Sequence, residues 1–558
     1  MSSSRPTSSL KRLSKTGKEG KMVLIAAFAF WLRDCFICSD VYLTLLCFTS
    51  VLLIVRTVQI YHLFRNLPPG PWGLPFLGFL PFLQGVPHLQ FCQLRRRYGS
   101  IFSARLGSHL VVVLSDYKTI RKAFRQEAFS ARPENEITAL MEGYGIINVD
   151  GDMWKDQRRF LHERLRSFGM KHVGHGKEQL ESRIMVEVET FLQAVAREKG
   201  NPCCLARSMT LSMSNVICSM LMSVRFDSED PRFKRFMFLI EEGFQLVSAT
   251  GAANFIPCLR NLPRIQELNV KIQNNRKEMQ EFFKEIVDLH KATFDPNNIR
   301  DMVDTYLLEI ELARKDQRFE LLFEGKDPDR QIYQIMGDLF SAGMETVKTT
   351  LQWSVVYMLH HPDIMKNVQD ELDQVVGRNR LPTLEDMAFL PYTEATLLEV
   401  LRRSTVVPMG TTHSTTREMD FEGFTIPKNS SVIPLIHAVH MDPKLWDHPE
   451  KFDPTRFLSA EGAVTKPEFF MPFGVGRRMC LGDVLARMEL FLFFSCLLHV
   501  YNLEVPAHET LPSIDGNTMG VTTTPDKFKV CVIPRQIELT TSLENFTEPA
   551  TTLLTRKK

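Results

Sequence analysis

The chain has 558 residues, 44% of them hydrophobic, so it is long enough to bury a large core and is not disordered as a whole. Its 67 basic and 65 acidic residues nearly cancel, which argues against a general nucleic-acid binder. Eleven irregularly spaced cysteines do not suggest a disulfide framework and favour a reducing compartment. Cys35 and Cys38 have the spacing of a metal-binding pair but lie in an apolar stretch, so we do not expect a zinc site.

The N-terminal region predicts a membrane anchor. Between residues 41 and 61 only Arg56 is charged, and a helix of that length, at about 1.5 Å per residue, would cross a bilayer core of roughly 30 Å. A buried core helix is the alternative. A second apolar run covers residues 22–32, so we assign 22–64 to an anchor region in contact with membrane lipid. Residues 65–82 include LPPGPWGLPFLG and predict a proline-rich hinge.

Residues 1–21 form a basic polar leader that complicates the orientation of the anchor. With this leader, the positive-inside rule would keep the N-terminus in the cytosol and place the main domain in the lumen. If translation starts at Met22 instead of Met1, the leader is lost, and Arg56 and Arg65 favour a cytosolic domain. We expect the cytosolic orientation, and the sequence leaves the start position open.

From residue 83 to 540 the pattern is mostly helical, and no linker interrupts it. Strand signals occur at 101–107 and 109–115, and another pair lies within 420–436. We therefore expect one large, mainly α domain with a minor β-sheet. A flexible tail should follow at 541–558.

One helix of this domain is especially well marked. Asp327 can cap it, Pro328 suits its first position, and its pattern continues to His361, just before Pro362. In its middle, SAGMETVKTT (341–350) has two small residues directly before an acid and a hydroxyl. This segment could hold a functional site, or it could be a packing glycine with an exposed polar face.

Cys480 ends a glycine-rich loop, FGVGRRMC (473–480), that precedes an apolar helix expected at 484–500. A thiolate binds a metal strongly only when its charge is stabilised. The loop exposes backbone N–H groups that can point at the sulfur, and the helix N-terminus favours negative charge. Cys480 is therefore a candidate metal ligand, with a buried structural cysteine as the alternative.

The same loop matches the haem-thiolate signature F-x-x-G-x-R-x-C-x-G of the cytochrome P450 family, at Phe473, Gly476, Arg478, Cys480 and Gly482. This signature is highly specific. The resemblance implies the fold of that family, haem b as the cofactor and the Cys480 thiolate as the axial ligand of its iron.

Further motifs of the family follow in the expected order. The resemblance extends over residues 67–535 and includes Trp154-x-x-x-Arg158, Ala342-Gly343-x-Glu345-Thr346, Glu399-x-x-Arg402 and Phe452-x-x-x-Arg456-Phe457.

Several of these residues are expected to bind the cofactor. Trp154 and Arg158 share one helical face at i, i+4. In the family, the counterparts of Arg158, Arg478 and His413 pair with the haem propionates, and Trp154 and Phe473 belong to the same site. Buried carboxylates need such partners. Without the resemblance, Arg158 would be interpreted as part of a solvated basic face.

Glu399 and Arg402 lie three residues apart on one helical face and can form a charge-assisted hydrogen bond. The resemblance implies that Arg456 completes a triad that stabilises the core beside the haem, which is a structural role. Without the resemblance, the pair would be a surface ion pair contributing less than about 1 kcal/mol.

The resemblance also implies a monooxygenase that uses O2, because a thiolate ligand favours O–O bond cleavage. Thr346 is expected to hold the reacting oxygen by a hydrogen bond, while Glu345 or a water molecule relays protons. No flavin or nucleotide fingerprint occurs, so the electrons should come from NADPH-cytochrome P450 reductase, with cytochrome b5 as a second partner. A haem-thiolate isomerase and a haem sensor are alternatives; the Glu345-Thr346 pair disfavours the isomerase.

Within the family, the chain resembles the insect ecdysteroid 26-hydroxylases, microsomal enzymes of steroid-hormone inactivation. The resemblance implies hydroxylation of a steroid side chain at the endoplasmic reticulum membrane. The alternatives are the related 25-hydroxylase of ecdysteroid synthesis and a xenobiotic or fatty-acid monooxygenase. The similar segments are WKDQRRFLHERLRSFGM (154–170), SNVICS (214–219), FDPNNIRD (294–301), DLFSAGMETVKTT (338–350) and FGVGRRMCLGDVLARMELFLFF (473–494).

A steroid requires a closed, mostly apolar cavity. The candidate walls are apolar stretches with a few hydroxyl or amide groups. They are residues 137–149, 238–247, 340–344, 405–411 and 517–524.

Overall fold

The computed structural model describes residues 44, 46–52, 54–55, 66–170, 175–519 and 521–535. The chain divides into two units, residues 1–67 and 68–558. In the first unit, residues 46–52 are helical. Among the described residues, no helix is both long and apolar enough to span a bilayer. The predicted leader, most of the predicted anchor (22–64) and the predicted tail lie outside the described residues, so they stay predictions.

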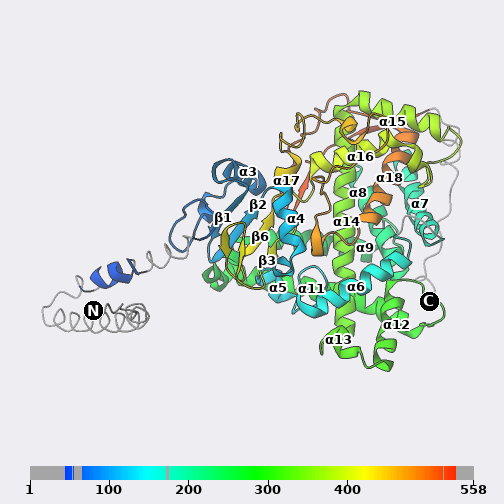
Figure 1. Ribbon diagram of the computed structural model, residues 1–558. Helices are drawn as coiled ribbons and strands as arrows, with labels where there is room; N and C mark the ends of the chain where they lie inside the picture. Colours follow the sequence, from blue (N-terminus) through cyan, green and yellow to red (C-terminus); the bar gives the residue numbers. More distant parts are fainter. Residues whose placement is uncertain are drawn as a thin grey trace, which may run out of the picture. The chain divides into compact units, whose positions relative to one another are not determined.

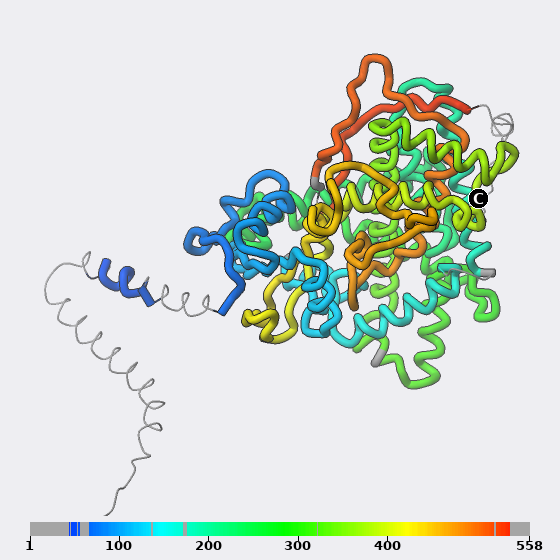
Figure 2. Tube along the Cα trace, turned by 45° about the horizontal axis from the view of Figure 1, so that its top comes forward, coloured from blue at the N-terminus to red at the C-terminus, as the bar shows by residue number. Residues whose placement is uncertain are grey.

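The second unit contains a sheet in the order β1-β2-β6-β3. β1 (Ile101–Leu106) and β2 (His109–Leu114) form an antiparallel hairpin, which confirms both strands predicted there. β2 runs parallel to β6 (Ser431–Pro434), and β6 is antiparallel to β3 (His413–Ser414). In Figure 2 the yellow segment that contains β3 and β6 lies beside the blue segment that contains β1 and β2.

The other strands form three two-stranded antiparallel ladders within the described residues. The predicted strand pair within 420–436 is confirmed in modified form, because this region contributes β4 and β5 as a hairpin and β6 to the larger sheet. The ladders are β4 (Met419–Phe421) with β5 (Phe424–Ile426), β7 (Tyr501–Glu504) with β10 (Cys531–Pro534), and β8 (Asn517–Met519) with β9 (Thr522–Thr524).

Helices make up most of the second unit, as predicted (Figure 1). Their bounds are α3 (Pro87–Tyr98), α4 (Tyr117–Arg125), α5 (Glu136–Leu140), α6 (Gly151–Ser167), α7 (His175–Ala196), α8 (Ala206–Met222), α9 (Pro231–Ala249), α10 (Gly251–Phe255), α11 (Pro263–Ala292), α12 (Met302–Lys315), α13 (Phe319–Phe323), α14 (Pro328–His360), α15 (Pro362–Val375), α16 (Pro391–Ser404), α17 (Ile436–His440) and α18 (Asp483–Val500).

Helix α14 runs through the middle of the helical part and packs against α8, α11, α16 and α18 (Figure 1). Its first turn has the predicted chemistry, because the Asp327 side chain accepts a hydrogen bond from the backbone N–H of Asp329 and Pro328 is the first helical residue. The helix ends at His360, and Pro362 begins α15. This arrangement brings residues 341–350 into the centre of the molecule.

Most of helix α18 is buried: every residue from Met488 to Val500 is buried in the core. It packs against α7, α14, α15 and α16. A helix that is apolar around its whole circumference belongs in the core. Its N-terminus at Asp483 directly follows the loop that contains Cys480.

Candidate active site

One cavity of the second unit brings together most of the residues that the motifs singled out. Its walls come from α6, α14, β3, the 473–480 loop and α18. Most of the lining side chains are apolar. The predicted site residues that line it are Trp154, Arg158, Thr346, His413, Phe473, Arg478 and Cys480.

The loop before α18 has a tight backbone path that presents Cys480 to the cavity. The N–H of Cys480 donates to the carbonyl oxygen of Phe473 at 2.9 Å. Gly476 has a φ of +81°, and a Cβ there would lie 2.2 Å from the carbonyl oxygen of Phe124. Only glycine can adopt this positive φ and also leave room for the Phe124 carbonyl oxygen, which explains why the motif has glycine at position 476.

The Cys480 thiol faces the cavity, where it is accessible, although it lies deep within the protein. Burial raises the pKa of this thiol. The nearby carboxylate of Asp483 also raises this pKa, whereas the N–H of Gly482 and the charges of Arg158 and Arg487 lower it and favour the thiolate. A bound metal cation would complete this stabilisation.

Three arginines line the same cavity: Arg132, Arg158 and Arg478. Each donates to backbone carbonyl oxygens, and none forms an ion pair with a described residue. Burial, together with repulsion from neighbouring arginines, lowers the pKa of Arg478 to about 8 and that of Arg132 to about 10. Asp150 offsets only part of this positive charge, so the three arginines favour an anionic ligand. Arg132 was not predicted, because it belongs to no spaced motif and only the fold brings it here.

Two buried polar atoms in this wall have no hydrogen-bond partner among the described residues, the Nη1 of Arg478 and the Nε1–H of Trp154. Both are donors in side chains that line the cavity. The carboxylates of a porphyrin would satisfy them. Together with the stabilised thiol, the residues present therefore fit haem.

His413 lies on β3 and stacks on Phe124, with ring centroids 3.8 Å apart and an interplanar angle of 5°. Its Nδ1 lies 2.7 Å from the carbonyl oxygen of Phe129, so Nδ1 carries the proton. Burial lowers the pKa of His413 to about 3. His413 can therefore donate from Nε2 to a propionate only as a cation, a form that an adjacent carboxylate favours.

Thr346 and Glu345 differ in their surroundings, although they are adjacent on α14. Thr346 lines the cavity, and its Oγ1 donates to the carbonyl oxygen of Ala342 at 2.8 Å. Glu345 is absent from the cavity lining; its carboxylate accepts from Lys348 Nζ at 2.5 Å and from Thr349 Oγ1 at 3.2 Å. This geometry favours water over Glu345 as the proton relay.

The segment 341–350 was interpreted either as part of a functional site or as a place where a glycine allows close packing, and Gly343 fits both. It lines the cavity, and a Cβ there would lie 2.7 Å from the Ile217 side chain on α8. The glycine is therefore a packing residue as well as part of the cavity wall.

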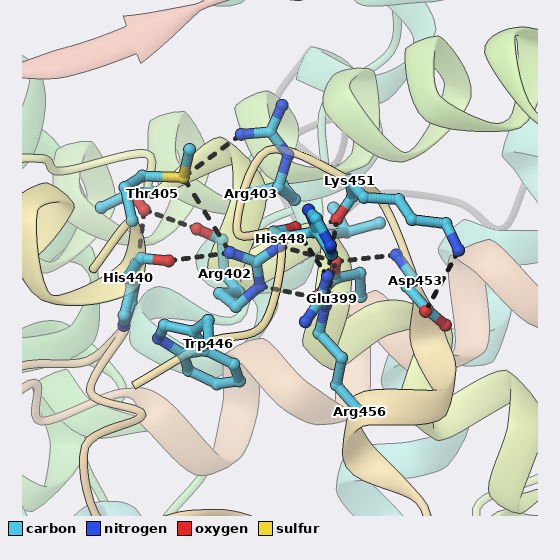
Figure 3. Close-up of polar contacts among 12 residues, drawn as sticks. Glu399, Arg402, Arg403, Thr405, His440, Trp446, His448, Lys451, Asp453 and Arg456 are labelled. Atoms are coloured by element: carbon cyan, nitrogen blue, oxygen red, sulfur yellow. Dashed lines mark hydrogen bonds and ion pairs between the residues drawn. The ribbon is translucent and has the colours of Figure 1, made fainter. Parts of the chain in front are cut away.

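Glu399 and Arg402 form a fully buried, two-pronged ion pair on α16 (Figure 3). Arg402 donates to the two carboxylate oxygens at 2.7 and 2.8 Å, and both side chains have 0% exposure. The Nε of Arg456 lies 3.5 Å from Glu399 Oε1, which completes the predicted triad geometrically, and the N–H of Asp453 donates to the same oxygen. The alternative of a surface ion pair is excluded.

Three of the five segments predicted as cavity walls contribute to the lining, namely 137–149, 340–344 and 405–411. The described residues of 238–247 and 517–524 do not line it. The first of these segments belongs to α9, which packs against α11, and the second forms the β8–β9 ladder beside α14. The prediction was wrong for 238–247 and finds no support in the described residues of 517–524, because apolar character alone does not distinguish a cavity wall from a packing surface. Residue 520 lies outside the described residues.

The loop before α6 is held against α14 by buried polar groups. Asp338 accepts hydrogen bonds from the backbone N–H groups of Ile146 and Ile147, at 2.8 and 3.0 Å. Gln331 exchanges two hydrogen bonds with the backbone of Gly145. These contacts place Ile146 and Ile147 in the cavity wall, within the segment 137–149 that the sequence predicted as a wall.

Comparison with known proteins agrees with this geometry. The family model for cytochrome P450 matches residues 68–532. The chain is 53% identical over 487 residues to Cytochrome P450 18a1 of Drosophila melanogaster, covering 87% of this chain and 90% of that protein. It is 36% identical to Cytochrome P450 2B19 of Mus musculus and 37% identical to Cytochrome P450 2D6 of Homo sapiens. Each match covers 84% of this chain, and 94% and 93% of the two mammalian proteins.

The cavity with its thiol, its arginines and its central helix defines a haem-thiolate oxidoreductase. The chain belongs to the cytochrome P450 family, whose members are monooxygenases that bind haem b through a cysteine thiolate. Cys480 is the one cysteine that lines the cavity within the described residues, so it is the candidate ligand in this chain.

Proposed function

We propose that this monooxygenase hydroxylates the terminal carbon of an ecdysteroid side chain, the 26 position, and thereby inactivates the moulting hormone. The observation that carries the proposal is that the segments resembling insect ecdysteroid 26-hydroxylases build the cavity. Four of the five similar segments, 154–170, 214–219, 338–350 and 473–494, contribute lining residues. The resemblance therefore concerns the walls that would contact a substrate, beyond the motifs that hold the haem.

The composition of the cavity supports a large, rigid, mainly apolar substrate with a few hydroxyl groups. Apolar side chains dominate the lining, and hydroxyl groups come from Thr346, Thr350 and Thr411. A steroid nucleus held by such walls would have its own hydroxyl groups satisfied away from the cofactor. The flexible side chain would then be the part presented to the reacting oxygen.

When bound, the haem supplies the oxidising chemistry that inserts one oxygen atom of O2 into a C–H bond. We propose that Arg132, Arg158, Arg478 and the cationic form of His413 hold its propionates. The Oγ1 of Thr346 would release its hydrogen bond to the carbonyl oxygen of Ala342 and donate into the cavity instead, while an ordered water relays protons. The apolar walls exclude bulk water, which limits the loss of protons and electrons to side reactions.

Members of the family take electrons from redox partners such as NADPH-cytochrome P450 reductase. We propose this reductase as the partner here and cytochrome b5 as a second one. We further propose that the protein resides in the endoplasmic reticulum membrane with its catalytic domain facing the cytosol, anchored through residues 22–64.

The direct test incubates the protein with the reductase, NADPH and 20-hydroxyecdysone and identifies the products by mass spectrometry. We expect a shift of the haem spectrum toward the high-spin form on binding, followed by a product with one added oxygen at the side-chain terminus. Addition at carbon 25 would support the biosynthetic alternative. Binding without any side-chain product, together with efficient oxidation of planar drugs or fatty acids, would reject the hormone proposal.

A further inference from the structure

One polar residue of α18 stands apart from its surroundings. Glu489 is 1% exposed, and its neighbours in the chain are Met488 and Leu490, both buried. It nevertheless lines the cofactor cavity, on the same helical face as Leu485, Ala486 and Leu490. A carboxyl group thus faces the cavity from a helix whose other cavity-lining residues are apolar.

The Glu489 carboxyl lacks the contacts that buried carboxyl groups normally have. Its Oε1 is fully buried and has no hydrogen-bond partner among the described residues. The other carboxyl group of the lining, Asp338, is saturated by two backbone N–H groups and by Gln334. Buried polar groups are almost always hydrogen-bonded, and an exception indicates a partner such as an ordered water.

Burial is the only influence that shifts the pKa of Glu489. Burial alone raises its pKa well above the ordinary range, with no contribution from Arg132, Arg158, Arg478 or any other charged group. A buried carboxylate without a cation is strongly disfavoured, so the neutral acid is the stable form. No described residue donates a hydrogen bond to its Oε1, so a water molecule is the simplest partner for this carboxyl group.

We propose that Glu489 is a neutral carboxylic acid that holds an internal water molecule in the wall of the cofactor cavity and thereby positions the haem. A neutral acid provides one O–H donor and free acceptor lone pairs, enough to bind one water. This water would fill a polar gap in an apolar wall without placing a charge near the iron. The proposal depends on the haem of the family and is independent of the steroid substrate.

The test compares the haem-loaded wild-type protein with Glu489→Gln and Glu489→Leu. The infrared difference between wild type and Glu489→Gln should contain the C=O stretching band of a protonated carboxylic acid at neutral pH. Glu489→Gln, which is neutral and still polar, should leave the reduction potential and the rate of haem transfer to apomyoglobin unchanged. Glu489→Leu should release haem roughly 10-fold faster, as is typical when an outer-shell hydrogen bond is lost.

A matched control is Met488→Leu, a substitution of similar volume at a neighbouring buried residue that does not line the cavity. It should leave the rate of haem transfer unchanged.

Two results would overturn the proposal. Absence of the infrared band, with a higher reduction potential in Glu489→Gln, would show that Glu489 is ionised, because removing a buried negative charge favours the reduced iron. Haem release at the wild-type rate from Glu489→Leu would show that the residue does not position the cofactor. If Glu489→Leu does not fold, the infrared spectrum and the reduction potential of Glu489→Gln decide whether Glu489 is the neutral acid proposed.

Discussion

The guanidinium of Arg478 lies over the indole ring of Trp154, with its central carbon 3.6 Å from the ring centroid. Stacking of this kind fixes the planar arginine group and leaves its edge available for hydrogen bonds. The Nη1 of Arg478 and the Nε1 of Trp154 are the two buried donors without partners in the cavity wall. The pair therefore presents two unpartnered donors to the cavity, where the carboxylates of a haem would accept them.

Arg478→Ala should weaken haem binding by about 10- to 100-fold, because it removes both a charge and an oriented donor next to a buried carboxylate. Trp154→Phe, which removes only one N–H, should have a smaller effect. Haem content of the purified protein and the rate of haem loss measure both changes. Arg477→Ala is the matched control, since Arg477 is exposed and does not line the cavity; equal haem loss in the two arginine variants would contradict the assignment.

Cys480→Ala should abolish the red-shifted absorption band that the ferrous haem-thiolate protein shows with carbon monoxide, together with turnover. The reason is that no other cysteine lines the cavity within the described residues. Cys204→Ala alters an exposed thiol outside the cavity and should leave the spectrum unchanged. A variant at position 480 that kept the band would remove Cys480 as the ligand.

Arg402→Ala should lower the free energy of unfolding by roughly 3 to 5 kcal/mol, because it leaves Glu399 charged, buried and without its two-pronged partner. Chemical denaturation followed by circular dichroism measures the change. Arg159→Ala is the control: Arg159 also pairs at i, i+3, with Asp156, but on the surface with 71% and 31% exposure, so its loss should cost less than about 1 kcal/mol. Similar losses in the two variants would show that the buried triad has no special role in stability.

Thr346→Ala should leave haem and substrate binding intact and divert electrons from NADPH into peroxide, because the cavity loses its proton-donating hydroxyl. Thr346→Ser keeps the hydroxyl and should preserve the coupling of NADPH consumption to product. The ratio of peroxide to hydroxylated product is the measurement. Unchanged coupling in Thr346→Ala would transfer the role to an ordered water or another group.

Lys348→Ala tests whether Glu345 is held out of the proton path by its ion pair. The two side chains are 2.5 Å apart and mostly shielded from water, with 17% and 18% exposure. If water supplies Thr346, as the cavity lining indicates, removing Lys348 should change the coupling ratio by less than about 2-fold, because a partly buried pair of this kind mainly affects stability. A larger change in coupling would show that Glu345 takes part in proton delivery.

The sequence alone was sufficient for the features that depend on local spacing. The haem loop needs a left-handed glycine and a cysteine at set distances, the long helix needs a cap and a starting proline, and the Glu399–Arg402 pair needs two residues on one helical turn. Each depends on backbone geometry over a few residues, so each can be recognised from the order of residues along the chain.

Other features depend on segments that only the tertiary structure brings together. Arg132 becomes part of the anion-binding wall because its loop folds beside Arg478, and 346 residues separate the two in the chain. Glu489 faces the cavity because of the rotation of α18 in its packing against other helices, and residues 238–247 are excluded from the wall because α9 packs against α11. Apolar periodicity specifies that a face of a helix is buried, but it does not specify what that face is buried against. The packing of the helices therefore decided which residues line the cavity and that the unpartnered carboxyl group of Glu489 is among them.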